Sequence, residues 1–65
     1  MTSYEEQKIR ELNWATTDVV VNIDRIWMML LDMKMDKEAR EVKRKKYEIL
    51  KLIKEVKRKY QEGGD

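Results

Sequence analysis

Residues 14–35, which read WATTDVVVNIDRIWMMLLDMKM, carry apolar side chains on two faces of one predicted helix. The first face belongs to a heptad repeat that begins upstream, with residues spaced alternately three and four positions apart. Its members are Ile9, Leu12, Thr16, Val19, Ile23, Ile26, Leu30 and Met33. An unbroken repeat of this kind, with heptad positions a and d, is typical of a seam between two packed helices.

The second face lies opposite that seam, at heptad position f. It consists of Trp14, Val21, Met28 and Met35, which recur every seven residues. Position f normally faces water and is polar, so an apolar row there needs a partner. We therefore expect another protein surface to cover this face.

A second heptad repeat follows, and its phase predicts where the chain turns. Its members are Ala39, Val42, Lys46, Ile49, Ile53, Val56 and Tyr60. The a positions at Leu30 and Ala39 are nine residues apart, a phase jump of two that a continuous coiled coil absorbs poorly. We expect an all-α antiparallel helical hairpin, a two-helix coiled coil, with a helix over about 4–33, a turn over about 34–36 and a helix over about 37–62. Asp36 is the expected N-cap of the second helix, and the alternative is one long helix bent at 34–36.

Composition supports helices. The 65 residues include no proline, no cysteine and no histidine, and both glycines lie at positions 63 and 64. Charged residues make up 43% and hydrophobic ones 42%, which suits an amphipathic helix and is too apolar for a disordered tail. We expect a single domain over 1–65.

The two predicted helices differ in character. In the helix over 37–62, position f is always basic, which is typical of a solvated supporting helix. Its residues there are Lys37, Arg44, Lys51 and Arg58. The helix over 4–33 contains the poor helix formers of residues 16–22, and local rules tend to fail at functional sites. A supporting helix that carries a binding helix is a division of labour found in engineered or designed binders, and thermophile or viral proteins fit it too.

The candidate partner-binding surface combines the f row with its polar borders. We predict that it comprises Trp14, Thr17, Asp18, Val21, Asp24, Arg25, Met28, Leu31, Asp32 and Met35. An apolar middle with a polar rim is the make-up of a protein interface, and tryptophan and arginine are typical hot-spot residues. Trp27, at position e, is expected to pack at the edge of the seam. The predicted function is therefore that of a protein-binding module.

Self-association is the alternative function. A 65-residue hairpin without a disulfide or metal is marginal, because two helices bury only one stripe each. A second copy of the chain would complete a homodimeric four-helix bundle. Lys46, a lysine at position a of the seam, would lower stability while fixing the register.

Other chemistries have little support. Without histidine or cysteine, and with its only serine at Ser3, the chain offers no catalytic set, no metal site and no cofactor site. The basic run Lys43–Lys46 makes nucleic acid a weaker third partner, because interleaved glutamates indicate a solvated surface. No signal peptide and no membrane span are expected, and a natural protein of this kind would be cytoplasmic.

Overall fold

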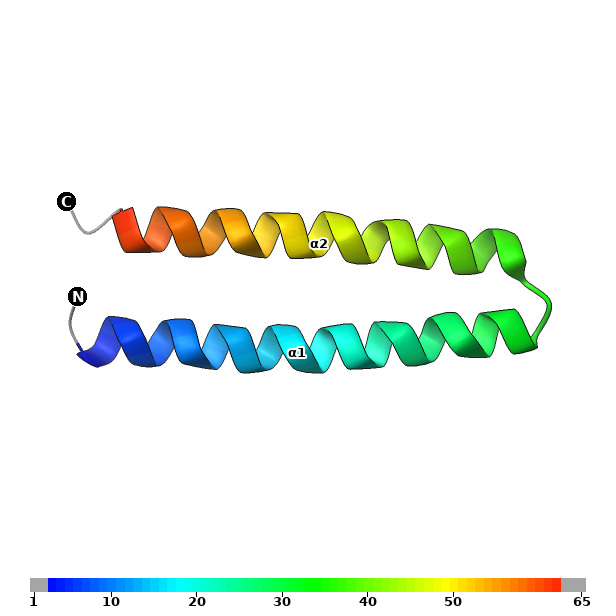
Figure 1. Cartoon of the computed structure of the whole chain (residues 1–65), viewed down its shortest axis with the longest axis horizontal. Helices are drawn as coiled ribbons and strands as arrows, with labels where there is room; N and C mark the ends of the chain where they lie inside the picture. The colour runs from blue at the N-terminus through cyan, green and yellow to red at the C-terminus, as the bar shows by residue number, and fades with distance from the viewer. Residues whose placement is uncertain (1–2, 63–65) are drawn as a thin grey trace.

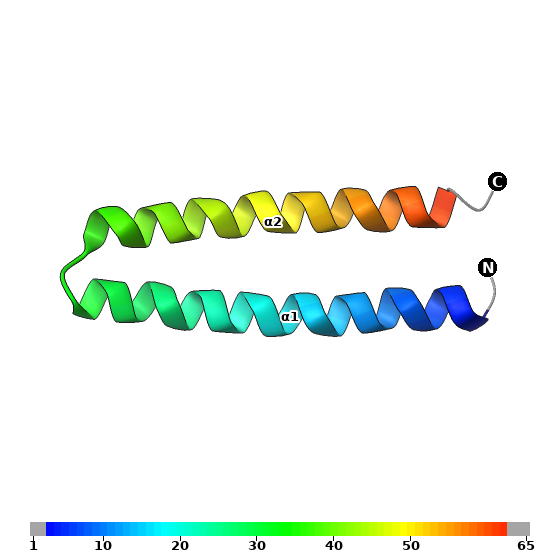
Figure 2. The same cartoon turned by 180° about the vertical axis from the view of Figure 1, so that it is seen from behind.

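The computed structural model describes residues 3–62 and consists of two helices, α1 (Ser3–Asp32) and α2 (Asp36–Glu62). They run antiparallel and side by side from the turn to the opposite end (Figure 1). The view from behind shows the same arrangement (Figure 2). The backbone measures 49 × 16 × 6 Å, so the molecule is a single layer two helices wide. The predicted all-α antiparallel hairpin is confirmed.

The turn is closed by backbone hydrogen bonds although it contains no glycine. Lys34 has a φ of 63°, in the left-handed region. Its amide donates to the carbonyl of Leu31 over 3.0 Å, and the amide of Met35 donates to that of Leu30 over 2.9 Å. These two bonds form a Schellman motif, in which a lysine occupies the position that glycine usually takes.

The second helix starts one residue earlier than the sequence predicts. The amide of Ala39 donates to the carbonyl of Met35 over 2.9 Å, which makes Met35 the capping residue. Asp36 is therefore the first helical residue, and its predicted role as N-cap is wrong. Its carboxylate still lies in the first turn of α2 with Glu38, where acidic groups suit the helix dipole.

The β-branched residues in the middle of α1 are accommodated within the helix. The hydroxyl of Thr16 donates to the carbonyl of Leu12 over 2.6 Å, and that of Thr17 donates to the carbonyl of Asn13 over 3.0 Å. Both threonines thus satisfy their hydroxyl groups four residues back along their own helix. No neighbouring element is needed to stabilise these polar groups.

The observed seam departs from the predicted one at position d. Leu12 is half-buried, but the exposed fraction rises to 39% at Val19, 48% at Ile26 and 60% at Met33. A straight α-helix drifts by about 20° per heptad against a 3.5-residue repeat, which turns the d row steadily out of the contact. Position e replaces it, since Val20 and Trp27 are half-buried.

The same drift occurs in α2. Val42 is half-buried, while Ile49 is 39% exposed and Val56 is 46% exposed. Position e again takes over the contact, at Leu50 and Lys57. The prediction that the d rows of both helices lie in the seam is therefore wrong beyond the first heptad of each. Ala39 is the one fully buried residue in the part of the chain that the structure describes.

The two d rows emerge on the same side of the hairpin. In an antiparallel pair, residues that precede the contact around both helices share one side, and residues that follow it share the other. A groove lined by Leu12 of α1 and Val56 and Tyr60 of α2 lies on the first side. We call this side the open face, and it comprises Val19, Ile26, Met33, Ile49, Leu52 and Val56. The opposite side, which holds Asn13 and Lys57, is the polar face.

Candidate functional site

The f row of α1 lies away from α2 and is uncovered. Trp14 is 66% exposed, Val21 is 50% exposed and Met28 is 60% exposed. Leu31, three residues after Met28, continues the row at 37%. We call these four residues the outer stripe. They form an apolar row on the outside of one helix, two helical turns from one member to the next between Trp14 and Met28.

The predicted site residues divide into three groups. Thr17, Asp18, Arg25 and Asp32 are exposed, and the helical period places them beside the outer stripe. Asp24 is half-buried, because Lys46 of α2 donates a hydrogen bond to its Oδ1 over 2.8 Å. Met35 lies in the turn, since α1 ends at Asp32 and the chain changes direction at Lys34. The structure therefore does not extend the outer stripe as far as Met35.

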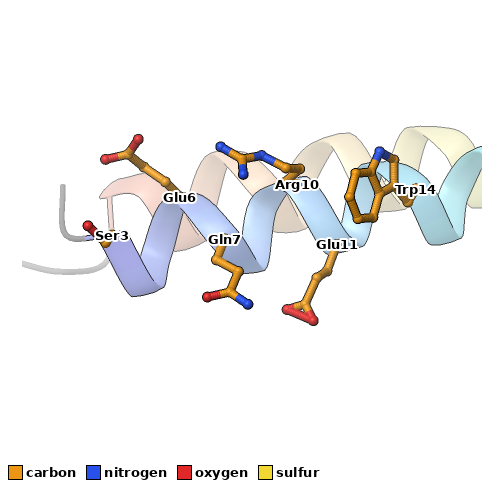
Figure 3. A pocket seen from close by; sticks show the side chains of 6 residues that line it. All are labelled: Ser3, Glu6, Gln7, Arg10, Glu11 and Trp14. Carbon is orange, nitrogen blue, oxygen red and sulfur yellow. The ribbon is translucent and has the colours of Figure 1, made fainter.

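Trp14 borders a shallow depression near the start of α1. The depression is lined by Ser3, Glu6, Gln7, Arg10, Glu11 and Trp14. Figure 3 shows Arg10 and Glu11 projecting to opposite sides of the row in which the indole stands, with α2 behind α1. The guanidinium group of Arg10 points toward the start of α1, away from the indole (Figure 3). The exposed ring is a large apolar surface beside this depression.

Cross-helix polar contacts lie on the polar face. The ammonium group of Lys57 donates to the side-chain oxygen of Asn13 over 2.9 Å. The ammonium group of Lys43 lies 4.2 Å from the centre of the Trp27 ring, a cation–π contact. Trp27 is half-buried at the edge of the seam. Together with the bond between Lys46 and Asp24, these contacts give three lysine side chains of α2 partners on α1.

The outward surface of α2 is a network of local ion pairs. Arg58 hydrogen-bonds both Glu55 and Glu62 within the same helix, and Arg44 pairs with Glu41. The hydrogen bond from Arg58 lowers the pKa of the Glu55 carboxyl below its usual value, and the same bond raises the pKa of Arg58. These pairs are solvent-exposed, and exposed pairs of this kind contribute little stability. They mark this surface of α2 as a solvated one.

Metal and membrane features are absent from residues 3–62. No group of three or more potential metal ligands comes together there. Neither helix, over the same residues, has a segment long and apolar enough to cross a membrane. No protein family, no curated protein and no solved structure matches this chain. The functional argument therefore depends on the site itself.

Sequence reasoning missed the open face. A strict 3.5-residue repeat places its residues Val19, Ile26 and Met33 of α1 and Ile49 and Val56 of α2 in the predicted seam. A 3.6-residue period would have moved Val19, Ile26 and Met33 progressively out of the contact. Leu52, an apolar residue at position g outside the predicted seam, was a further signal in the sequence, and the structure leaves it 63% exposed.

Proposed function

We propose that this chain is a non-enzymatic protein-binding module that docks a partner protein through the outer stripe of α1. The exposure of Trp14, Val21 and Met28 carries this proposal, since α2 covers none of them. Exposure of three apolar side chains in one row to water is unfavourable in free energy, and a bound partner would remove that exposure. An aligned row of exposed apolar side chains on one helix is typical of an interaction site.

The spacing of the outer stripe indicates how a partner would bind. Trp14, Val21, Met28 and Leu31 follow the pattern of anchors with which an amphipathic helix enters a hydrophobic groove. Methionine adapts to irregular surfaces, while the rigid indole of Trp14 fills a pocket at low entropic cost. We expect Trp14 to be the principal anchor.

The charged borders indicate the chemistry of the partner. Asp18 and Asp32 are exposed beside the stripe, with Arg25 between them. Asp24 is already engaged by Lys46, so it contributes less to a partner contact. The expected partner has an apolar groove with a mainly basic rim. Charge complementarity of this kind speeds association and selects among partners more than it adds affinity.

The proposal can be tested by selecting, from a displayed library of proteins, those that bind the hairpin. Binders retained by the unaltered hairpin are purified, and their affinity for Trp14→Ala and Met28→Ala hairpins is measured by calorimetry. Trp14→Ala is expected to weaken binding by about 2 kcal/mol or more, because a truncated hot spot costs that much. Circular dichroism should show unchanged helix content, since both side chains point away from α2.

Tyr47→Ala is the matched control. Tyr47 is a 60% exposed aromatic residue on α2, outside the outer stripe. Its truncation should leave the affinity for the same partner within about threefold, as for surface positions outside an interface. Binding partners that tolerate both Trp14→Ala and Met28→Ala would rule out the outer stripe as the docking surface.

A further inference from the structure

The open face is the largest feature that the proposed function does not use. It runs along one side of both helices, from Met33 near the turn to Val56 towards the opposite end. At that opposite end it continues into the groove beside Tyr60. The cross-helix hydrogen bonds of Lys46 with Asp24 and of Lys57 with Asn13 lie on the polar face instead. A two-helix layer with one apolar side is half of a packed domain.

The surface area shows how much covering the hairpin lacks. A compact protein of 8.0 kDa exposes about 4,500 Å². This chain exposes 5572 Å², and within residues 3–62 it buries only Ala39 completely. The excess, roughly 1,100 Å² by the same scaling, is more than a monomer of this size normally leaves in water.

We infer that the open face binds a second copy of this chain, giving a four-helix bundle. Two separate hairpins that merged into a compact protein of twice the mass would bury at most about 3,800 Å² by the same scaling. That area falls within the range of about 2,000–5,000 Å² found for obligate homodimers. Association of two copies would thus cover the open face and create the buried core that a single hairpin lacks.

A second copy fits this face because both helices contribute to it. The apolar residues recur at the same heptad spacing in α1 and α2, as Val19 and Ile26 do in one helix and Ile49 and Val56 in the other. A hairpin related by a two-fold axis has apolar residues at the same spacing and over the same length. Its apolar rows can therefore pack against the rows of this face. Lys45, beside the open face on α2, can extend its apolar stem along such an interface and keep its charge in water.

The outer stripe stays free in this arrangement. Trp14, Val21 and Met28 lie on the far side of α1 from the open face, because they follow the α2 contact around the helix whereas the d row precedes it. The bundle therefore carries two outer stripes, one from each copy. Self-association and partner binding use different surfaces, so each can fail in experiment without the other.

Light scattering on a sizing column tests the inference over a hundredfold range of protein concentration. The unaltered chain is expected at twice 8.0 kDa. Ile26→Lys and Val56→Lys should each shift it to the single mass, raising the dissociation constant about a hundredfold or more. Each lysine would enter the interface twice and lose its hydration there.

Val21→Lys is the matched control. Val21 is 50% exposed on the outer stripe, and Ile26 is 48% exposed on the open face. Both are β-branched residues of α1, so the change in helix propensity is the same in kind. Val21→Lys should keep the double mass. Circular dichroism at the same concentrations shows whether each variant remains helical.

Several results would overturn the inference. An unaltered chain that stays at 8.0 kDa throughout would assign the open face to a different protein. A double mass that survives Ile26→Lys and Val56→Lys, or that is lost equally with Val21→Lys, would place the contact elsewhere. A mass of three or more copies would exclude the two-copy bundle.

Discussion

Lys46 of α2 reaches across the helix pair and donates a hydrogen bond to Asp24 of α1 over 2.8 Å. Its side chain is only 14% exposed, whereas that of Asp24 is 48% exposed. A lysine at position a would ordinarily weaken a seam. Here the apolar stem of Lys46 lies in the seam, and its ammonium group reaches the polar face, where it pairs with the carboxylate of Asp24.

A double-mutant cycle on this pair measures that contact. Asp24→Asn, Lys46→Met and the double variant are unfolded in urea at one protein concentration. We expect a coupling of about 1 kcal/mol, above that of a fully exposed pair because Lys46 is largely buried. The exposed pair of Glu41 and Arg44 is the control, with an expected coupling below about 0.5 kcal/mol. Equal coupling in both cycles would show that the cross-helix bond stabilises the fold no more than an exposed ion pair does.

Substitution of Lys43 tests the cation–π contact with Trp27. Lys43→Gln removes the charge that lies 4.2 Å from the ring centre and keeps most of the stem. The free energy of unfolding should fall by about 0.5–1 kcal/mol, the usual range for such a contact near the surface. Lys54→Gln, a change at an exposed lysine of the same helix, should leave stability within about 0.5 kcal/mol. A similar loss in both variants would indicate a general charge effect.

The two tryptophans distinguish the outer stripe from the seam. Acrylamide should quench a Trp27→Phe chain, which retains only Trp14, more strongly than a Trp14→Phe chain, because Trp14 is 66% exposed and Trp27 is half-buried. The difference should persist at concentrations where two copies associate through the open face. Protection of Trp14 under those conditions would show that the outer stripe is buried on self-association.

Lys34→Gly tests the turn. Lys34 holds a φ of 63°, which costs a non-glycine residue roughly 1–2 kcal/mol, and the greater freedom of unfolded glycine offsets part of the gain. We expect a net increase in stability of about 0.5–1 kcal/mol, seen as a higher urea midpoint with an unchanged slope. Lys51→Gly, at an exposed position in the interior of α2, should lower stability by about 1 kcal/mol. A destabilised Lys34→Gly chain would argue against the left-handed turn.

Glu55 provides a test of the α2 surface. Its carboxyl should titrate below the usual value of 4.5 in an NMR experiment, because Arg58 hydrogen-bonds the charged form. A lowered folded-state pKa means that the pair contributes above the unfolded pKa and is lost as the pH falls through the folded one. Arg58→Gln should move the titration back upwards. An unchanged midpoint in that variant would show that the two side chains are not paired in solution.

The hairpin itself was predictable from sequence, and so was the position of the turn. The nine-residue step from Leu30 to Ala39 broke the heptad phase, and the structure turns at residues 33–35. The a positions of α1 also lie in the seam as expected. These features depend on local spacing alone, which a sequence displays directly.

The second half of each seam was not predictable in the same way. Whether two helices supercoil or stay straight decides which residues face the partner helix beyond the first heptad. The heptad repeat therefore predicts Val19 and Ile26 inside the seam, whereas the structure leaves them 39% and 48% exposed. The contacts of Asn13 with Lys57 and of Trp27 with Lys43 depend on the axial alignment of the helices, which no local pattern specifies.

Ser3 and Glu62, where the two helices begin and end, lie at the same end of the molecule (Figure 2). If the chain were instead one uninterrupted helix, about 1.5 Å per residue would separate these positions by about 90 Å. A pair of dyes attached there would thus transfer energy efficiently in the hairpin and hardly at all in the extended form. Because the chain has no cysteine, two introduced cysteines would carry these labels without competing sites. Opening and closing of the hairpin could then be followed in single molecules, independently of what either apolar surface binds.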